Sequence, residues 1–246
     1  MNTDRTKHIA WRPAECHPFE SAWSIAQKFC RWNGAGLAEF WSLVSVDLYQ
    51  PLPASRQYLR NAKWLDRDKF GLLFRLSPDR IRNAFSDRYA PTPHLEVCLV
   101  DPRHVRFCPT CSRRGFHSPL HELLLLAHCP IHGDPLLETC PSCRKPISAE
   151  ITRAANCDPY ACRCGHVLWP SVRSPAFSKT ESAALQTVLN WLDRNVEFIS
   201  SRLEEFEIRQ DLFGDAQRII VSEAIRWISE IDPDAPPYVA RPPRKP

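Results

Sequence analysis

Phe107-Cys-Pro-Thr-Cys111 opens a stretch that continues through Cys129-Pro-Ile-His132 and Cys140-Pro-Ser-Cys143 and ends with Cys162-Arg-Cys-Gly165. It holds eight soft metal ligands in four close pairs. A Cys-x-x-Cys pair places two thiolates on one turn, from which both can reach a Zn²⁺ ion at about 2.3 Å, and a second pair completes the tetrahedron. Residues 107–165 are thus predicted to form two zinc sites in series.

The spacing assigns four ligands to each site. The first site has the pattern C-x2-C-x17-C-x2-H and the second C-x2-C-x18-C-x-C. A site closed by four protein ligands has no open position for water, so the predicted role of both ions is structural. The predicted ligands are Cys108, Cys111, Cys129 and His132 in the first site, and Cys140, Cys143, Cys162 and Cys164 in the second.

Two of these positions have alternatives. His128 is the alternative to His132 as the histidine ligand. Only His132 lies three residues after Cys129, as in the Cys-x-x-Cys pairs, and is followed by a glycine. Cys157 is the alternative to Cys162 as the third ligand of the second site, because a loop from Cys157 to Cys164 could also bring both thiols to one metal ion. The tight turn of Cys162-Arg-Cys-Gly favours Cys162.

The composition is that of an ordinary folded protein of one or two domains, with 246 residues, 43% hydrophobic and 24% charged. Residues 2–8 are polar and charged, so we expect no secretory signal, no membrane span and a cytoplasmic location. In a reducing compartment, cysteine pairs at ligand spacing favour metal over disulfides. The odd number of cysteines, 11, agrees with this interpretation.

Hydrophobic periodicity predicts a mainly α fold with small zinc-ribbon-like β elements. A tandem zinc-finger module lies between N-terminal and C-terminal helices in this prediction. We divide the chain into a flexible lead-in (1–16), an N-terminal helical region (17–102), the tandem zinc-finger module (103–170), a C-terminal helical hairpin (176–232) and a disordered proline-rich basic tail (233–246).

The N-terminal region contains a candidate helix-turn-helix. Residues 58–76 are expected to be helical in two pieces, and Ser77 followed by Pro78 is a strong start signal for a helix over 78–86. Two short helices around a tight turn fit a unit whose second helix enters the major groove of DNA. Plain helical packing is the alternative.

Charge is unevenly distributed. Residues 56–173 carry 18 Lys/Arg against 11 Asp/Glu, whereas residues 177–232 carry 6 against 11. The basic middle fits contact with nucleic-acid phosphates, while the acidic C-terminal helices favour packing or protein contact over DNA contact. The candidate phosphate contacts flank the ligand pairs and are Arg103, Arg106, Arg113, Arg114, Arg144 and Lys145.

Catalytic functions are less well supported. A zinc deaminase carries H-x-E before P-C-x-x-C, whereas here His121 and Glu122 are adjacent and both pairs read Cys-Pro-x-Cys. A metal-supported nuclease needs further polar groups, for which His117, His121 and Asn156 are available. We therefore expect no enzyme; the alternatives to a DNA-binding role are a zinc-stabilised protein-interaction module and such a nuclease.

The chain resembles the TniQ family of transposition proteins. The resemblance begins at His17-Pro-Phe-Glu-Ser21 with Asn33-Gly34 and continues through Gly115-Phe-His117, Leu136-Leu137 and the four ligand pairs. It implies a non-catalytic targeting adaptor of a bacterial transposon, with two structural zinc ions at the predicted ligands. Cys162 is the looser match, His121 stands where members often carry an aromatic residue, and the chain is shorter than the long members.

The partners implied by this resemblance are duplex DNA or a CRISPR effector complex, an AAA+ ATPase regulator that activates a separate transposase, and a second copy of the chain in a homodimer. A stand-alone relative outside any transposon is the alternative within the family.

Overall fold

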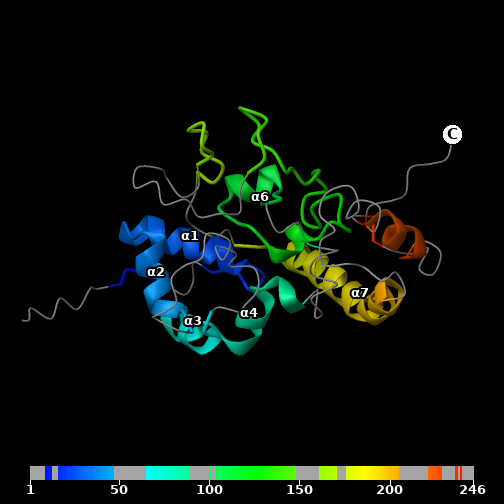
Figure 1. Ribbon diagram of the computed structural model, residues 1–246, viewed down its shortest axis with the longest axis horizontal. Coiled ribbons are helices and arrows are strands. Elements are labelled where there is room, and N and C mark those ends of the chain that lie inside the picture. Colours follow the sequence, from blue (N-terminus) through cyan, green and yellow to red (C-terminus); the bar gives the residue numbers. More distant parts are fainter. Residues whose placement is uncertain are drawn as a thin grey trace, which may run out of the picture.

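The computed structural model describes residues 9–12, 16–46, 65–88, 100, 104–147, 161–170, 176–204, 221–228, 236–237 and 239. Within them the protein is mainly helical, as predicted (Figure 1). The α-helices are α1 (Ala22–Asn33), α2 (Leu37–Val44), α3 (Arg67–Phe74), α4 (Pro78–Asn83), α6 (Pro109–Arg113) and α7 (Lys179–Glu204), and residues 221–228 are also helical. Two 3₁₀ turns, η3 (Ser86–Arg88) and η4 (Pro119–Glu122), complete the elements that the structure bounds.

Several predicted features lie outside the described residues. They include the helical piece before residue 65, the turn between the two predicted C-terminal helices, most of the basic tail, Arg103, Cys157 and Asn156. Within that tail Val239 is 5% exposed, and it forms an antiparallel bridge with Leu126 in the C-terminal core. No helix in the described part of the chain combines the length and apolar character needed to cross a membrane.

The predicted β elements are reduced to isolated antiparallel bridges in the described residues. Four of them accompany the ligand pairs and join Phe107 to Leu137, His128 to Pro135, Thr139 to Pro146 and Ala161 to Val167. Two of these bridges contain a proline, which has no N–H to extend a ladder. The turn demanded by each ligand pair interrupts the remaining backbone, so the bridges do not grow into strands.

Helix α1 is the central element of the N-terminal half. Ser21 begins it, because its Oγ accepts the N–H of Ser24 at 3.1 Å, and Gly34 ends it with a left-handed φ of 56°. Every residue from Ala22 to Cys30 is buried. A helix buried all round needs neighbours on several sides, and α1 and its cap contact α2, Ala84, His117 and Trp169.

Lys28 of α1 forms an ion pair with Glu20, and both side chains are 0% exposed. Glu20 also accepts a hydrogen bond from the Ser24 hydroxyl at 2.7 Å and from the His17 N–H at 3.1 Å. The carboxylate is thus fully enclosed and multiply bonded. Such a pair adds geometric specificity to the start of α1, because each charge requires the other.

The hydrophobic side chains form two cores, and the predicted metal ligands divide between them. The N-terminal core comprises side chains of α1 to α4 together with Cys140, Ile147, Cys162 and Trp169. The C-terminal core comprises side chains of α7 and residues 221–228 together with Cys108, Cys111 and Cys129. Each centre is therefore attached to a core through some of its cysteines, which are Cys108, Cys111 and Cys129 in the first centre and Cys140 and Cys162 in the second.

Trp169 anchors the second ligand set to the N-terminal core. Its ring is 1% exposed and lies 5.0 Å from Trp23 and 5.4 Å from Phe107, centroid to centroid. The indole N–H donates to the carbonyl of Phe116 at 3.4 Å, and its own carbonyl accepts from Arg31 at 3.1 Å. A large buried aromatic with a satisfied N–H is a strong anchor.

We predict that Lys28→Met lowers the free energy of unfolding by about 3–5 kcal/mol, because it leaves the Glu20 carboxylate buried without the ammonium group. The double variant Lys28→Met/Glu20→Gln should recover most of that loss. Denaturant unfolding followed by circular dichroism measures both.

The control is Arg82→Met, which breaks the exposed pair of Arg82 with Asp79 and should cost less than about 1 kcal/mol. A single variant Lys28→Met as stable as the wild type would contradict this account of the buried pair.

Candidate metal centres

The first ligand pair is built into a helix start. Cys108 precedes α6, and its Sγ accepts the N–H of Cys111 at 3.4 Å, while Pro109 occupies the first helical position. Proline is favoured there because its missing N–H has no partner to lose. The hydrogen bond fixes the Cys108 sulfur at the start of the helix, on the same turn as the Cys111 side chain.

The other three pairs lie on turns that close in a similar way, over five residues in the second and third pairs and over four in the last. In each, the residue after the second ligand has left-handed torsions, and its N–H donates to the carbonyl of the first ligand. These residues are Gly133, Arg144 and Gly165, with φ of 70°, 58° and 87° and N–H···O distances of 2.8 Å. Glycine adopts this φ without steric cost, whereas Arg144 does so under strain. The repeated turn brings both side chains of a pair to one point.

The first centre gathers Cys108, Cys111, Cys129 and His132. The Nδ1 atom of His132 lies 3.5, 3.3 and 3.7 Å from the three sulfurs in that order, and the sulfurs of Cys111 and Cys129 are 3.6 Å apart. Ligands of a tetrahedral zinc ion at about 2.0–2.3 Å are separated by about 3.5–3.8 Å. The observed separations match that geometry. His132 and not the exposed His128 joins the cysteines.

The second centre gathers Cys140, Cys143, Cys162 and Cys164. The sulfur of Cys140 lies 3.7 Å from that of Cys164, and the sulfur of Cys143 lies 3.6 Å from that of Cys162. A disulfide has an S–S length of about 2.05 Å, so these are thiols at ligand separation. Cys162 completes this set, while its alternative Cys157 lies outside the described residues.

Both sets fit a structural metal ion. In each, the four ligand atoms lie within 4.8 Å of one another. Three thiols and an imidazole, or four thiols, complete a tetrahedron without a position for water. The chemistry available at these two centres is therefore structural.

The thiols of the first centre influence one another. Hydrogen bonds from the side chains of Cys108 and Cys111 lower the pKa of Cys129 to about 4, whereas burial raises the pKa of Cys111 well above its usual value. A metal ion must displace the remaining thiol protons to bind. Metal affinity at this centre should therefore fall as the pH falls.

His132 also connects the first centre to α7. Its Nε2 atom lies 3.1 Å from the guanidinium of Arg114, which pairs with Glu181 at the start of α7. Glu181 completes a capping box with Ser178, whose N–H donates to the carboxylate at 2.8 Å and whose Oγ accepts the Glu181 N–H at 3.1 Å. The Arg114 hydrogen bond is the main reason why the pKa of Glu181 falls to about 2.

His121 lies behind the first centre. The side chain is 0% exposed, its Nδ1 accepts the N–H of Ser118 at 3.4 Å, and its Nε2 lies 3.7 Å from the sulfur of Cys129. An acceptor at Nδ1 places the proton on Nε2, facing the sulfur. His121 thus supports a ligand and does not offer a surface group for catalysis.

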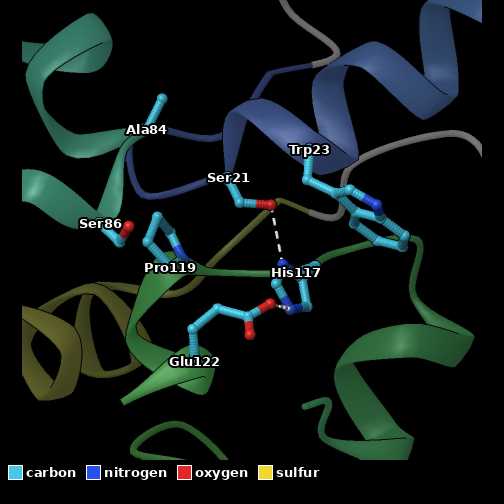
Figure 2. Close-up of a pocket in the computed structure, with 7 residues that line it drawn as sticks. All are labelled: Ser21, Trp23, Ala84, Ser86, His117, Pro119 and Glu122. Carbon is cyan, nitrogen blue, oxygen red and sulfur yellow. Dashed lines mark hydrogen bonds and ion pairs between the residues drawn. The ribbon is translucent and has the colours of Figure 1, made fainter. Parts of the chain in front are cut away.

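A Ser–His–Glu chain joins α1 to the ligand stretch (Figure 2). The Ser21 hydroxyl lies 2.8 Å from Nδ1 of His117, and Nε2 of His117 lies 3.2 Å from Glu122 and 2.8 Å from the carbonyl of Arg106. The connectivity resembles a hydrolase triad, but all three side chains are buried. The adjoining cavity of about 10 Å³ has room for no more than one water. The arrangement is structural.

The candidate phosphate contacts have different fates. The prediction that Arg106 contacts phosphate is wrong. The residue is 5% exposed, and its guanidinium donates to the carbonyls of Leu123 at 2.6 Å and Leu126 at 2.9 Å, out of reach of DNA. The Arg114 side chain is also engaged within the protein, because it pairs with Glu181 and lies over the ring of Phe177 at 5.0 Å.

Arg113, Arg144 and Lys145 are exposed. Sequence reasoning missed Arg163, which is exposed on the turn between two ligands of the second centre. Its place inside the Cys162-Arg-Cys-Gly turn was the available signal, because a side chain between two inward-facing ligands points outward.

Comparisons of the chain with models of protein families, with curated proteins and with solved structures give no match.

We predict two metal ions per chain, measured by inductively coupled plasma mass spectrometry on protein purified without added metal. Cys111→Ser and Cys143→Ser should each lower the content to about one, because each removes one ligand from a different closed set. The matched control is Cys30→Ala, which removes a buried thiol from the N-terminal core and should leave the content at two. Metal-free wild-type protein would contradict the assignment.

We predict that Glu181→Gln loosens the start of α7 while both metal ions stay bound. The change removes the charge that holds Arg114 but leaves a side chain able to cap the helix, so the free energy of unfolding should fall by about 1 kcal/mol. Hydrogen exchange over 177–185 should rise. Glu197→Gln, an exposed change on the same helix, is the control and should leave exchange there unchanged.

Proposed function

We propose that both centres hold zinc and that the protein is a zinc-stabilised, non-catalytic DNA-binding adaptor of the TniQ type. The observation that carries the metal assignment is the closure of both ligand sets by thiolates and one imidazole, the donor set that zinc prefers in structural sites. In this proposal the ions hold two cores in place as a tandem zinc-finger arrangement, and recognition belongs to the surfaces around them.

The helix pair α3 and α4 supplies the DNA-binding surface in this proposal. Three residues connect the helices, and Arg75 turns the chain with a left-handed φ of 53°. The helices approach so closely at Gly71 that an added Cβ would lie 2.4 Å from Cδ1 of Ile81. A tight turn and a small residue at the crossing fit a helix-turn-helix.

The second helix of this pair is accessible. Ser77 begins α4, with its Oγ accepting the Arg80 N–H at 3.4 Å, and Ser77, Pro78 and Asp79 are exposed. Arg82 is exposed and pairs with Asp79 on the same helix. Residues of a recognition helix near its N-terminus contact base edges, and arginines beside them contact phosphates.

The second metal centre offers a separate basic surface. In Figure 1 the two ligand turns of that centre lie at the top of the molecule, whereas α3 and α4 lie at the bottom. A duplex on α4 therefore leaves Arg144, Lys145 and Arg163 free for another partner. Two separated surfaces fit an adaptor that contacts target DNA and recruits an AAA+ ATPase regulator or a transposase.

A protein-interaction module without a nucleic-acid role is the second candidate. A groove of about 510 Å³ beside α1 and α2 favours it, with Ile9, Phe29, Ala35 and Leu43 among its lining residues. Apolar grooves with a few polar groups are typical binding sites. DNA binding separates the two candidates.

We predict salt-dependent binding to duplex DNA, measured by fluorescence anisotropy across a range of salt concentrations. Replacing two phosphate contacts in Arg80→Gln/Arg82→Gln should weaken binding to all sequences and reduce the slope of log affinity against log salt by about 2. Arg194→Gln, an exposed change on α7, should leave the slope unchanged.

No duplex binding at low salt by the wild-type protein would overturn the DNA assignment and favour the interaction module. Binding that Arg80→Gln/Arg82→Gln leaves intact would move the DNA surface away from α4.

A further inference from the structure

The two metal centres differ in their exposure to solvent. The cysteines of the first centre, Cys108, Cys111 and Cys129, are each 0% exposed. In the second centre Cys140 is 0% and Cys162 9% exposed, whereas Cys143 is half-buried and Cys164 is exposed. A small oxidant in solution can therefore reach the sulfur of Cys164 but not the sulfurs of the first centre.

The backbone keeps Cys164 at the surface. It lies on the turn closed by the Gly165 N–H and the Cys162 carbonyl at 2.8 Å, and its neighbours Arg163 and His166 are also exposed. An accessible thiolate beside a cation is the setting in which cysteine reacts with oxidants.

The Cys140 thiol lies close enough to Cys164 to form a disulfide with it. The sulfur of Cys140 lies 3.7 Å from that of Cys164, and the bond of a disulfide is about 2.05 Å long. Closing that gap needs a movement of less than about 2 Å on a surface turn. Cys140 itself is buried, so it meets an oxidised Cys164 sooner than it meets an oxidant from solution.

We propose that Cys164 is a peroxide-sensitive modification site and that its oxidation to a disulfide with Cys140 opens the second metal centre. The inference rests on the zinc occupancy proposed above for that centre. It adds a redox response to a site that otherwise serves only the fold.

The chemistry balances with hydrogen peroxide as the oxidant. The Cys164 thiolate attacks one peroxide oxygen, the O–O bond breaks, and hydroxide leaves while the sulfur becomes a sulfenic acid. The Cys140 thiolate then attacks that sulfur, the S–S bond forms, and a second hydroxide leaves. Two thiolates together give up two electrons, and the two hydroxides take up protons to become water.

The consequence is local. The metal ion of the second centre loses two of its four ligands, while all ligands of the first centre are untouched. Cys162 and Trp169 belong to the N-terminal core, so release loosens the packing of residues 161–170 on α1. The basic surface of Arg144, Lys145 and Arg163 loses its fixed shape, and thiol reductants with zinc restore it.

The test treats the zinc-loaded full chain with hydrogen peroxide and follows zinc release with a chromogenic indicator. We expect one of two zinc ions to be released, with a Cys140–Cys164 disulfide in the peptide map and recovery after dithiothreitol and zinc. Cys164→His keeps a possible ligand but removes the reactive sulfur, and should slow release at least about tenfold. The matched control Cys30→Ala, which removes a buried thiol outside both centres, should leave the rate unchanged.

If Cys164→His fails to retain zinc, the wild type is treated briefly with hydrogen peroxide in the presence of a sulfenic-acid reagent. Cys164 should then be the first cysteine that the reagent captures. Release of both ions at equal rates, first capture at another cysteine, or no release at all would overturn the inference while leaving the zinc assignment intact. Fewer than two zinc ions before peroxide is added would overturn the zinc assignment and the inference together.

Discussion

The described structure depends on one geometric constraint. Each turn of the ligand stretch must hold two ligand side chains, and two such turns must meet at each centre. The turns at Gly133, Arg144 and Gly165 repeat one backbone hydrogen bond. Because the ligand stretch has only isolated bridges among its described residues, no β-sheet fixes its path. The convergence of thiols and imidazole at the two centres takes that role, and structural metal binding contributes folding free energy directly.

Each centre is connected to a different part of the chain. The first centre reaches α7 through His132, Arg114 and Glu181, and its cysteines lie in the C-terminal core. The second centre reaches α1 through Trp169, which packs on Trp23. The Ser21–His117 hydrogen bond joins the start of α1 to the segment between the first two ligand pairs. Helices far apart in sequence are thus positioned by a short, loop-rich stretch.

Local signals in the sequence predicted the local structure well. Ser77 acts at the start of α4 as predicted, because capping depends only on residues a few positions away. The eight ligands were predictable for the same reason, since a pair needs only one turn. The choice of His132 over His128 followed from its spacing to Cys129 and from the glycine after it.

Long-range features escaped prediction because their cause is three-dimensional. Arg106 looked like a surface cation beside a ligand, yet it bonds carbonyls 17 and 20 residues away inside the fold. Glu20 and Lys28 are eight residues apart, not the three or four of an ordinary helix pair, so nothing local indicated that they form an enclosed ion pair. Nothing local indicated that the two centres would join separate cores, because that depends on where Trp169 and α7 pack.

If metal binding at the two centres positions both α1 and α7, its loss should loosen both helices. Hydrogen exchange on the full chain, with and without bound metal, measures that loosening. Removing the metal should raise exchange in the ligand stretch and also in α1 and α7. Full protection of α1 and α7 in the metal-free protein would contradict it.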